Sequence, residues 1–561
     1  MLHTTPTKVL LATTLQPLVV QLSGSLAHGA KLIAQFLDHE PTPQQMVTFE
    51  RELRVLLREV GRRIVAWVLN HVEPECPEEA PARLWWKGQA YRRRRTHRTT
   101  VATLFGPVVV WRRLYEPLTP GRRALHPLEI TLGIEAGVAT PALAERVGRW
   151  AADHTQRQVL EILQYDHGVH WSCATLRRLL SSLSAGLAPH RQVAQIAQVV
   201  RWLHQARAST GRFQPILAVG RDGVNVPLRH REWKEGATAT VSVLDRRGKR
   251  VGTVYLGQMP ESGQTTLTTH LTALLQDILK QVDAQGLRLV YVSDDRYHPS
   301  DYDHTVLKTM PDPKRPWCQL TWIRIVDYYH ACLYIQQLAE ALFGSTPQGR
   351  AGAQQMRQHL KTKSDGITRV LQSAGAIRRQ HGLWGKAKDY DQAYAYLHKR
   401  THWMRYRHYS GQRLPIGSGI TEAACQTVFT QRLKRSGMAW TITGGQVILD
   451  LRVIWLSGIW ENVHQRYLAS QPMPTTQEER AQVAQPGQQA ASLIGNGAIT
   501  PYQHGLLHSS LTALSYHMRL QQEGSSQGFS EMPGYSSIDS AIGLLKVLPG
   551  SRPYPDWGQS R

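Results

Sequence analysis

The first part of the chain carries apolar residues at a spacing of three to four positions. Such spacing is typical of the buried face of an amphipathic helix. Within residues 6–72 it is clearest at Leu53, Leu56, Leu57, Val60, Ile64 and Val68. Pro74, Pro77 and Pro81 then interrupt the pattern, and proline rarely continues a helix. We therefore expect an N-terminal helical region over residues 1–75.

Two short alternating runs follow, at 99–104 and 108–114. Gly106 and Pro107 stand between them and are typical turn residues, which predicts a β-hairpin. We expect residues 76–125 to form a small, basic, β-containing region that contacts DNA.

Helical spacing returns over residues 126–211. Gly168 separates two predicted helices there, and Ser172 is a favourable N-cap for the second. This order is that of a helix-turn-helix that reads the major groove. It is equally the order of an ordinary pair of packed helices.

From residue 214 the element order predicts a mixed α/β core. An apolar strand ends near Asp222, and two alternating strands flank the turn at 245–248. An amphipathic helix precedes a fourth strand, which ends at two aspartates, and a fifth strand runs into a helix. Three antiparallel strands, a helix and further strands are the element order of an RNase H-like fold.

The predicted core is interrupted by a long helical stretch, and the C-terminal segment is rich in Gln, Ser, Gly and Pro. Segments of that composition are typical of flexible tails. The remaining boundaries are therefore the first part of the core at 212–330, an all-helical insertion at 331–410, the second part of the core at 411–468 and a low-complexity tail at 469–561.

Composition narrows the class of partner. The 561 residues include 66 Lys and Arg against 42 Asp and Glu, which leaves a formal charge of +24. At about 100–200 residues per domain, this length predicts three or four domains. A positive excess of this size favours a polyanion such as nucleic acid. The five cysteines include no CxxC pair, which indicates a reducing, cytoplasmic compartment. The sequence contains no run of about eighteen apolar residues, so we expect no membrane span.

Three acidic residues stand at the ends of predicted core elements. Asp222 ends the first strand, Asp294 ends the fourth, and Glu422 begins the helix after Gly417-Ser418-Gly419. In an RNase H-like sheet the first and fourth strands are neighbours, so these carboxylates would converge. Two-metal phosphoryl transfer needs acidic ligands around ions about 3.5–4 Å apart, and Mg²⁺ prefers oxygen ligands. We expect the three acids to be metal ligands and catalytic residues, with two Mg²⁺ ions bound and Mn²⁺ as a substitute.

Each acid also has an ordinary structural interpretation. Asp222 precedes a glycine, as in many turns, Asp294 is placed to cap the next segment, and Glu422 suits the first turn of any helix. Asp294 is preferred as the second ligand because it directly follows the apolar run of the fourth strand. Three neighbours compete with it: Asp295, Asp301 and Asp303.

Several segments resemble the DDE transposases of bacterial insertion sequences, most closely the ISKra-type family. They include GRDGV, VSDDR and VDYYHACLYI. In that family a GSG-x-x-E motif precedes an R-x-K-x-x-G-M-x-W segment. The first motif is carried here by Gly417-Ser418-Gly419 with Glu422, and the second by Arg432, Lys434, Gly437, Met438 and Trp440. The likeness covers roughly residues 85–465, but the cysteine pair that relatives often carry after the N-terminal strands is missing, so a zinc site is not implied.

This resemblance implies a DNA transposase whose DDE triad is Asp222, Asp294 and Glu422. Such an enzyme binds terminal inverted repeats, cuts at the transposon end with Mg²⁺ and joins the freed 3′-hydroxyl to target DNA. Two ends must be handled together, so a homodimer or larger assembly is expected. Asp327 and His330 match a D-x-x-H element of related transposases. This pair could support the metal ligands or contact a flipped nucleotide, or His330 could be a purely structural histidine.

Clustered cations are the candidate DNA-binding residues. Guanidinium groups pair with phosphates and enter the minor groove, although a solvated basic surface has the same composition. The candidates are Arg92, Arg93, Arg94, Arg95, Arg98, Arg177, Arg178, Arg432, Lys434 and Arg435. Two rival functions remain at this point. An RNase H-like nuclease would need the same triad without transposition, and a domesticated DNA-binding protein would keep the cations with an inactive core.

Overall fold

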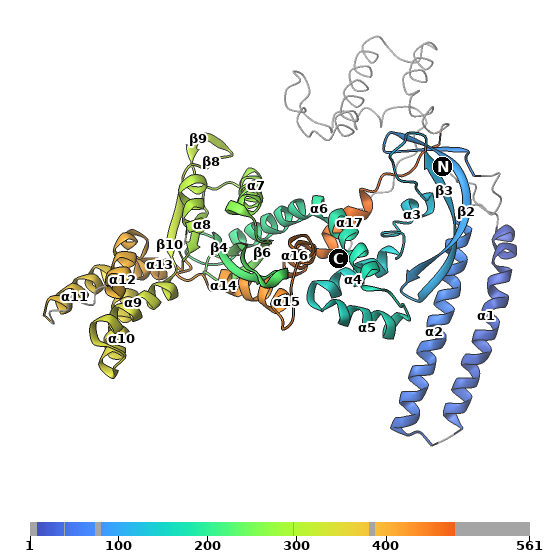
Figure 1. The fold of residues 1–561 in the computed structure, drawn as a ribbon, viewed down its shortest axis with the longest axis horizontal. Coiled ribbons are helices and arrows are strands. Elements are labelled where there is room, and N and C mark those ends of the chain that lie inside the picture. Colours follow the sequence, from blue (N-terminus) through green and yellow to red (C-terminus); the bar gives the residue numbers. More distant parts are fainter. Residues whose placement is uncertain (1–7, 39, 73–79, 295–296, 381–387, 477–561) are drawn as a thin grey trace, which may run out of the picture. The chain divides into compact units, whose positions relative to one another are not determined.

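The computed structural model describes residues 8–38, 40–72, 80–294, 297–380 and 388–476. The described residues up to Pro474 belong to one compact unit, drawn in colour in Figure 1. The candidate ligand Asp295 and nearly all of the predicted tail, from residue 477 onward, lie outside the described residues.

The predicted N-terminal helical region consists of two paired helices, α1 (Lys8–Leu37) and α2 (Pro43–His71). They lie side by side (Figure 1) and are joined near the turn by the rings of Phe36 and Phe49, whose centroids are 4.9 Å apart. Thr42 caps α2 by accepting a hydrogen bond from the Gln45 amide, which satisfies a donor that the first helical turn leaves open.

The basic region is a three-stranded antiparallel sheet in the order β1-β2-β3. Its hairpin turns at residues 104–105, so the predicted turn at Gly106-Pro107 is wrong by two positions, and Gly106 begins β3 with a φ of 113°. Pairing along the whole hairpin makes both strands longer than the apolar runs predicted, and the arginine run lies within β2. The strands are β1 (Arg83–Trp86), β2 (Gln89–Thr103) and β3 (Gly106–Pro117).

The predicted helical region 126–211 is confirmed. Gly168 ends one helix in the left-handed conformation (φ 62°), and the Ser172 hydroxyl caps the next by accepting from the Thr175 amide. That next helix is 36 residues long and buries leucines at both ends, from Leu176 to Leu203, so it is a core helix along its length. The helices are α3 (Pro127–Thr131), α4 (Pro141–Asp153), α5 (Gln156–His167) and α6 (Cys173–Ala208).

A mixed five-stranded sheet forms the centre of the α/β part, in the order β10-β7-β4-β5-β6. β5 runs antiparallel to both of its neighbours, β4 and β6, whereas β7 and β10 run parallel to β4. The strands are β4 (Ile216–Pro227), β5 (Trp233–Leu244), β6 (Arg250–Gln258), β7 (Arg288–Ser293) and β10 (Trp322–Val326). The five predicted strands are therefore confirmed in kind and order.

One boundary in this sheet was predicted wrongly. β4 does not end near Asp222 but continues five residues further, to Pro227. The stretch from Gly223 to Pro227 stays extended because β5 pairs with it throughout, as far as Pro227 opposite Trp233. Short connecting elements flank these strands: η2 (Arg229–Arg231), η3 (Ser262–Gln264), α8 (Tyr297–Tyr302), η4 (Asp303–Leu307), β8 (Pro311–Asp312) and β9 (Arg315–Gln319).

The two faces of the sheet carry different helices. Leu217 and Val219 of β4 point to one face, which α6 and α7 (Thr265–Gln281) cover. Ile216 and Ala218 point to the other face and pack with the helical insertion. This insertion follows β10, as predicted, and consists of α9 (Tyr328–Phe343), α10 (Pro347–Thr362), α11 (Gly366–Gln380), α12 (Lys388–Lys399), η5 (Thr401–Trp403) and α13 (Tyr406–Gly411).

The helix that begins beside the GSG sequence is continuous from α14 (Gly419–Ala424) through a π-helical turn, η6 (Cys425–Thr430), into α15 (Gln431–Leu433). Two further helices follow, α16 (Ile442–Leu456) and α17 (Trp460–Ala469), and the chain breaks between them at Gly458 with a φ of 66°. In the described residues no single helix has the length and apolarity to cross a membrane. The sharply bent pair α16–α17 has that length and apolarity only when its two helices are counted together.

Candidate active site

Asp222 and Asp294 occupy equivalent positions on neighbouring parallel strands. Every residue of β7 that pairs with β4 has a number 72 higher than its partner, from Ile216 opposite Arg288 to Gly220 opposite Val292. Asp294 stands in the same relation to Asp222, one residue beyond the end of β7. Adjacent strands lie about 4.8 Å apart, so the register brings the two carboxylates to one end of the sheet.

Both aspartates also share one face of the sheet. Successive side chains of a strand point to opposite faces, and Asp222 follows Ala218 and Gly220 by steps of two. This is the face on which α14 packs. The Thr421 hydroxyl of α14 lies 2.8 Å from the Thr240 hydroxyl of β5. The adjacent residue, Glu422, is therefore brought to the same face as the two aspartates.

Gly220 permits this close approach of α14 to the sheet. A Cβ atom at position 220 would collide with the Thr421 Oγ1 atom and would lie 3.1 Å from the Thr421 Cβ atom. Any larger residue would push the helix, and Glu422 with it, away from Asp222. Gly220, two positions before Asp222, is thus a steric requirement of the site.

The electrostatic surroundings of the Cys425 thiol indicate that the three acids lie in one region. Its Sγ atom donates a hydrogen bond to Asp222 Oδ2 at 3.3 Å. Burial raises the pKa of this thiol well above its usual range, and the negative charges of Asp222, Glu422 and Asp294 raise it further. All three acids therefore lie within electrostatic reach of one side chain, which stays protonated across the physiological range.

Hydrogen bonds orient two of the carboxylates. The Gly223 amide donates to Asp222 Oδ1 at 2.7 Å, and the Ser418 hydroxyl donates to Glu422 Oε1 at 2.8 Å. Carboxylate oxygens are the ligands that Mg²⁺ prefers, so the donor chemistry fits a magnesium site. No group of three or more His, Cys, Asp or Glu side chains in the described residues is close enough to hold a metal ion. The three acids thus share a site without forming a closed ligand set.

Asp327 holds the GSG loop against the sheet. It follows β10 as Asp294 follows β7, and its amide donates to the Ser293 carbonyl at 2.9 Å. Its carboxylate is fully buried and accepts hydrogen bonds from the backbone amides of His330 and Ser418. Asp327 is therefore linked to Glu422 through Ser418, whose amide donates to Asp327 and whose hydroxyl donates to Glu422. The His330 ring packs edge-on to Tyr334 and Tyr396, and the Tyr396 hydroxyl donates to the Asp294 carbonyl at 2.8 Å.

The competing acids that the structure describes lie in different surroundings. Asp303 is buried and forms an ion pair with Arg324, whose Nη1 atom is 2.6 Å from Asp303 Oδ2. This carboxylate therefore compensates a buried cation. Asp301 is exposed on α8. Of the acids near the end of β7, Asp294 alone among those described matches the register of Asp222.

The cations after Glu422 are less exposed than the sequence suggested. Three arginines cap the last carbonyl groups of α4: Arg432 Nε donates to Ala151 at 3.0 Å, Arg452 Nη1 to Ala152 at 2.7 Å and Arg435 Nη2 to Asp153 at 2.9 Å. Cations are favourable at a helix C-terminus. The Lys434 ammonium lies 5.7 Å from the centre of the Trp233 ring.

The other candidate DNA contacts lie on β2 and at the start of α6. Arg92, Arg95 and Arg98 are exposed, and Arg98 lies 5.3 Å from the centre of the Trp111 ring. Two neighbours are engaged within the protein: Arg93 with the Ala80 carbonyl and Arg94 with Glu116. Arg177 and Arg178 are both exposed on α6.

Sequence reasoning missed Gly220, Thr421 and Cys425. The signal available for Gly220 was a glycine two positions before the first aspartate, on the same face of a predicted strand. Nothing comparable marks Cys425, whose role depends on how α14 packs. No protein-family model and no curated protein matches this sequence. Its function therefore has to be inferred from the site and from the sequence resemblance.

Proposed function

We propose that this chain is a DNA transposase of the DDE type with an RNase H-like core, similar to the ISKra-type family. The observation that carries the proposal is the shared position of Asp222 and Asp294 on adjacent parallel strands, with Glu422 above them from a helix. An RNase H-like core requires the strand order β10-β7-β4-β5-β6, in which the three strands that come first in the sequence, β4, β5 and β6, form an antiparallel meander.

The chemistry assigned to the site is two successive phosphoryl transfers. Water first attacks the phosphodiester at the transposon end and releases a 3′-hydroxyl. This hydroxyl then attacks a phosphodiester of the target DNA, from which the target's own 3′-oxygen leaves. Asp222, Asp294 and Glu422 would hold two Mg²⁺ ions, or Mn²⁺ in their place. When bound, such ions make a bound water or hydroxyl more nucleophilic and stabilise the leaving oxygen. The chain contributes the positions of the ligands: strand register sets the two aspartates, and Asp327 together with the Ser418 loop sets Glu422.

The partner is double-stranded DNA, as transposon terminal inverted repeats and as target. The formal charge of +24 supports a polyanionic partner, and the exposed arginines of β2 offer a surface for phosphates. Pairing of two transposon ends requires a homodimer or larger assembly, and the proposed location is the bacterial cytoplasm.

A strand-transfer assay tests this proposal. The full chain is incubated with Mg²⁺, a labelled terminal repeat from the DNA that flanks its gene, and a plasmid target. A transposase produces labelled plasmid joined at the repeat's 3′ end. Cleavage without joining would support the nuclease, and binding without cleavage would support the protein with an inactive core. Either result contradicts the proposal.

Replacing Gly220 by alanine is expected to lower cleavage on the order of 10²-fold, because a displacement of about 1 Å at a catalytic group has that effect. The new Cβ atom would collide with Thr421 and displace Glu422. The measurement is the rate of end cleavage at saturating Mg²⁺, with DNA binding determined in parallel. Gly375→Ala is the matched control, because no described atom beyond its chain neighbours and its own helical backbone lies within 4 Å of the added methyl group. Equal rates for the two variants would show that α14 does not need this close approach.

Replacing Arg92, Arg95 and Arg98 together by glutamine is expected to weaken DNA binding at all sequences. Each lost phosphate contact lowers the salt slope of log K by about 1, so the slope should fall by up to about 3. The measurement is DNA affinity across a series of salt concentrations. Arg94→Gln is the control, because Glu116 already pairs with this arginine at 2.5 Å. An unchanged slope in the triple variant would remove β2 from the DNA-binding surface.

A further inference from the structure

Arg432 is a buried cation with unsatisfied hydrogen-bond donors. None of its surface is exposed, and its Nη1 and Nη2 atoms have no hydrogen-bond partner among the described residues. Its Nε atom donates to the Ala151 carbonyl. The nearby Asp153 carboxylate is paired with Arg452 at 3.0 Å. An uncompensated buried charge is costly, so this guanidinium favours an anion beside it.

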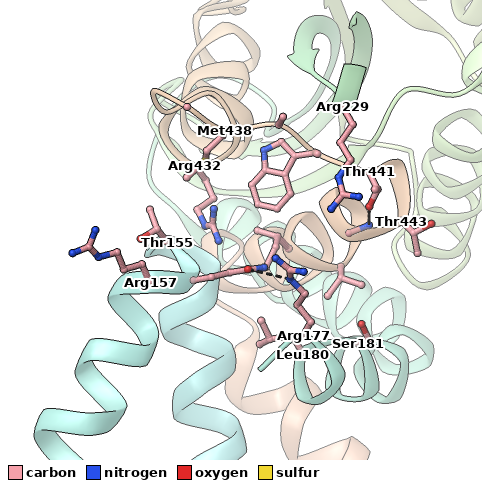
Figure 2. A pocket seen from close by; sticks show the side chains of 17 residues that line it. Thr155, Arg157, Arg177, Leu180, Ser181, Arg229, Arg432, Met438, Thr441 and Thr443 are labelled. Carbon is pink, nitrogen blue, oxygen red and sulfur yellow. Dashed lines mark hydrogen bonds between the residues drawn. The ribbon is translucent and has the colours of Figure 1, made fainter. Parts of the chain in front are cut away.

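A pocket of about 540 Å³ lies against Arg432. Figure 2 shows the guanidinium groups of Arg177, Arg229 and Arg432 directed toward this hollow, while that of Arg157 points away. Arg177 and Arg229 are exposed residues and can contact a ligand directly. Among the described residues that line the pocket, none is Asp or Glu. The electrostatic environment of the hollow is therefore positive.

Two helices begin at the same pocket. Thr155, the N-cap of α5, and Gln156 line it from one side, while Thr441, the N-cap of α16, and Gly444 line it from the other. These helices have 12 and 15 residues. The amide groups and the positive dipole end of a helix N-terminus favour anions such as phosphate. The two helix ends and the arginines thus favour the same class of ligand.

The rest of the wall is apolar. Leu180, Val447 and Ile448 line the pocket together with the Trp440 ring, which lies 5.4 Å from Arg432 Cζ. The Trp440 indole is fixed by a hydrogen bond from its Nε1 atom to the Leu433 carbonyl at 2.8 Å. Pockets of roughly 300–1,000 Å³ hold small molecules, so this one has room for the sugar or base attached to a phosphate.

We propose that this pocket binds the phosphate group of a nucleotide, with Arg177 and Arg229 in contact, Arg432 behind the wall and the apolar side against the sugar or base. The site is separate from the three carboxylates. Arg432 follows Glu422 by ten residues of nearly continuous helix, roughly 15 Å. That a phosphate binds here does not depend on the function proposed above. That the phosphate belongs to a DNA strand does rest on it.

Ligand binding to the full chain tests the inference. The probes are inorganic phosphate, a deoxynucleoside 5′-monophosphate and a short oligonucleotide, each measured by titration calorimetry at constant ionic strength. We expect at least one of the three to bind the wild type. Loss of a charge-assisted contact in Arg177→Gln should weaken that binding about tenfold. Arg201→Gln is the matched control, because Arg201 is an exposed arginine of the same helix, does not line the pocket and is not among the candidate DNA contacts.

Arg432→Gln is the second variant, and its expected effect is an equal or larger loss of affinity. Because this change also removes a cap from α4, Arg177→Gln keeps the test valid if Arg432→Gln does not fold. Tightest binding of the oligonucleotide identifies a DNA phosphate, and tightest binding of the monophosphate identifies a free nucleotide. Failure of all three probes to bind, or an equal loss in Arg201→Gln, would overturn the inference. Neither result depends on whether the chain cleaves DNA.

Discussion

Asp222→Asn is expected to lower DNA end cleavage on the order of 10³-fold or more while DNA binding is retained. The amide removes a negative ligand from the site. Metal assistance contributes several kcal/mol to such reactions, and about 1.4 kcal/mol corresponds to tenfold in rate. Asp294→Asn and Glu422→Gln should have effects of the same order, since all three acids lie within electrostatic reach of the Cys425 thiol. The triple variant should be hardly worse than each single variant, because ligands of one site act as a unit.

The measurement is single-turnover cleavage of a labelled terminal repeat in Mg²⁺. Asp301→Asn is the matched control, because this acid also follows β7 but is exposed on α8. We expect it to cleave at nearly the wild-type rate. Wild-type cleavage by Asp222→Asn or Glu422→Gln would show that the triad is assigned wrongly. Loss of cleavage in Asp301→Asn alone would move the second ligand to that position.

Asp303→Asn is expected to destabilise the protein by about 3–5 kcal/mol, the usual cost of removing one partner from a buried ion pair. The side chains of Asp303 and Arg324 are 2% and 4% exposed. The Arg324 guanidinium also contacts the Ser300 hydroxyl at 2.9 Å, the His304 ring and the Trp403 ring. None of these supplies a full negative charge.

Urea denaturation measures this effect as the change in the free energy of unfolding. Asp365→Asn is the matched control, because Asp365 forms a similar ion pair with Arg369 at 2.8 Å with both side chains about half exposed. Its replacement should leave the unfolding midpoint nearly unchanged. The double variant Asp303→Leu, Arg324→Met should recover much of the lost stability, since an apolar pair can replace a buried ion pair. Equal midpoints for Asp303→Asn and wild type would contradict the structural role of this acid.

The sequence predicted the elements of the sheet well, because long apolar or alternating runs are compatible with few structures besides strands and buried helices. The strands around Asp222 and Asp294 and the turn at 245–248 are examples. The end of β4 was predicted too early, because Gly223, Asn225 and Pro227 are residues typical of turns. Their extended conformation comes from pairing with β5, which is a tertiary effect. The same cause extended β2 through a run of arginines.

Three features in and around the candidate site depend on contacts between segments that are separated in the sequence: one ion pair, one helix cap and one strand register. Asp303 and Arg324 pair across 21 positions, and Arg432 reaches α4 across 281. A positive charge after Glu422 looks like a DNA contact in the sequence, whereas the structure buries it against a helix end. The equivalence of Asp222 and Asp294 required the register of two strands, which apolar patterning alone does not specify. The three acids that the structure brings together could therefore be named from the sequence, and the side chains that support them could not.

The most direct test of the proposed triad is the position of Mn²⁺ in a crystal of the full chain bound to terminal-repeat DNA. Anomalous scattering locates this ion independently of the protein coordinates. We predict Mn²⁺ between the carboxylates of Asp222, Asp294 and Glu422, beside the DNA phosphodiester that is cut. A complex that cleaves DNA with its Mn²⁺ bound by other residues, and none at these three acids, would contradict the assignment.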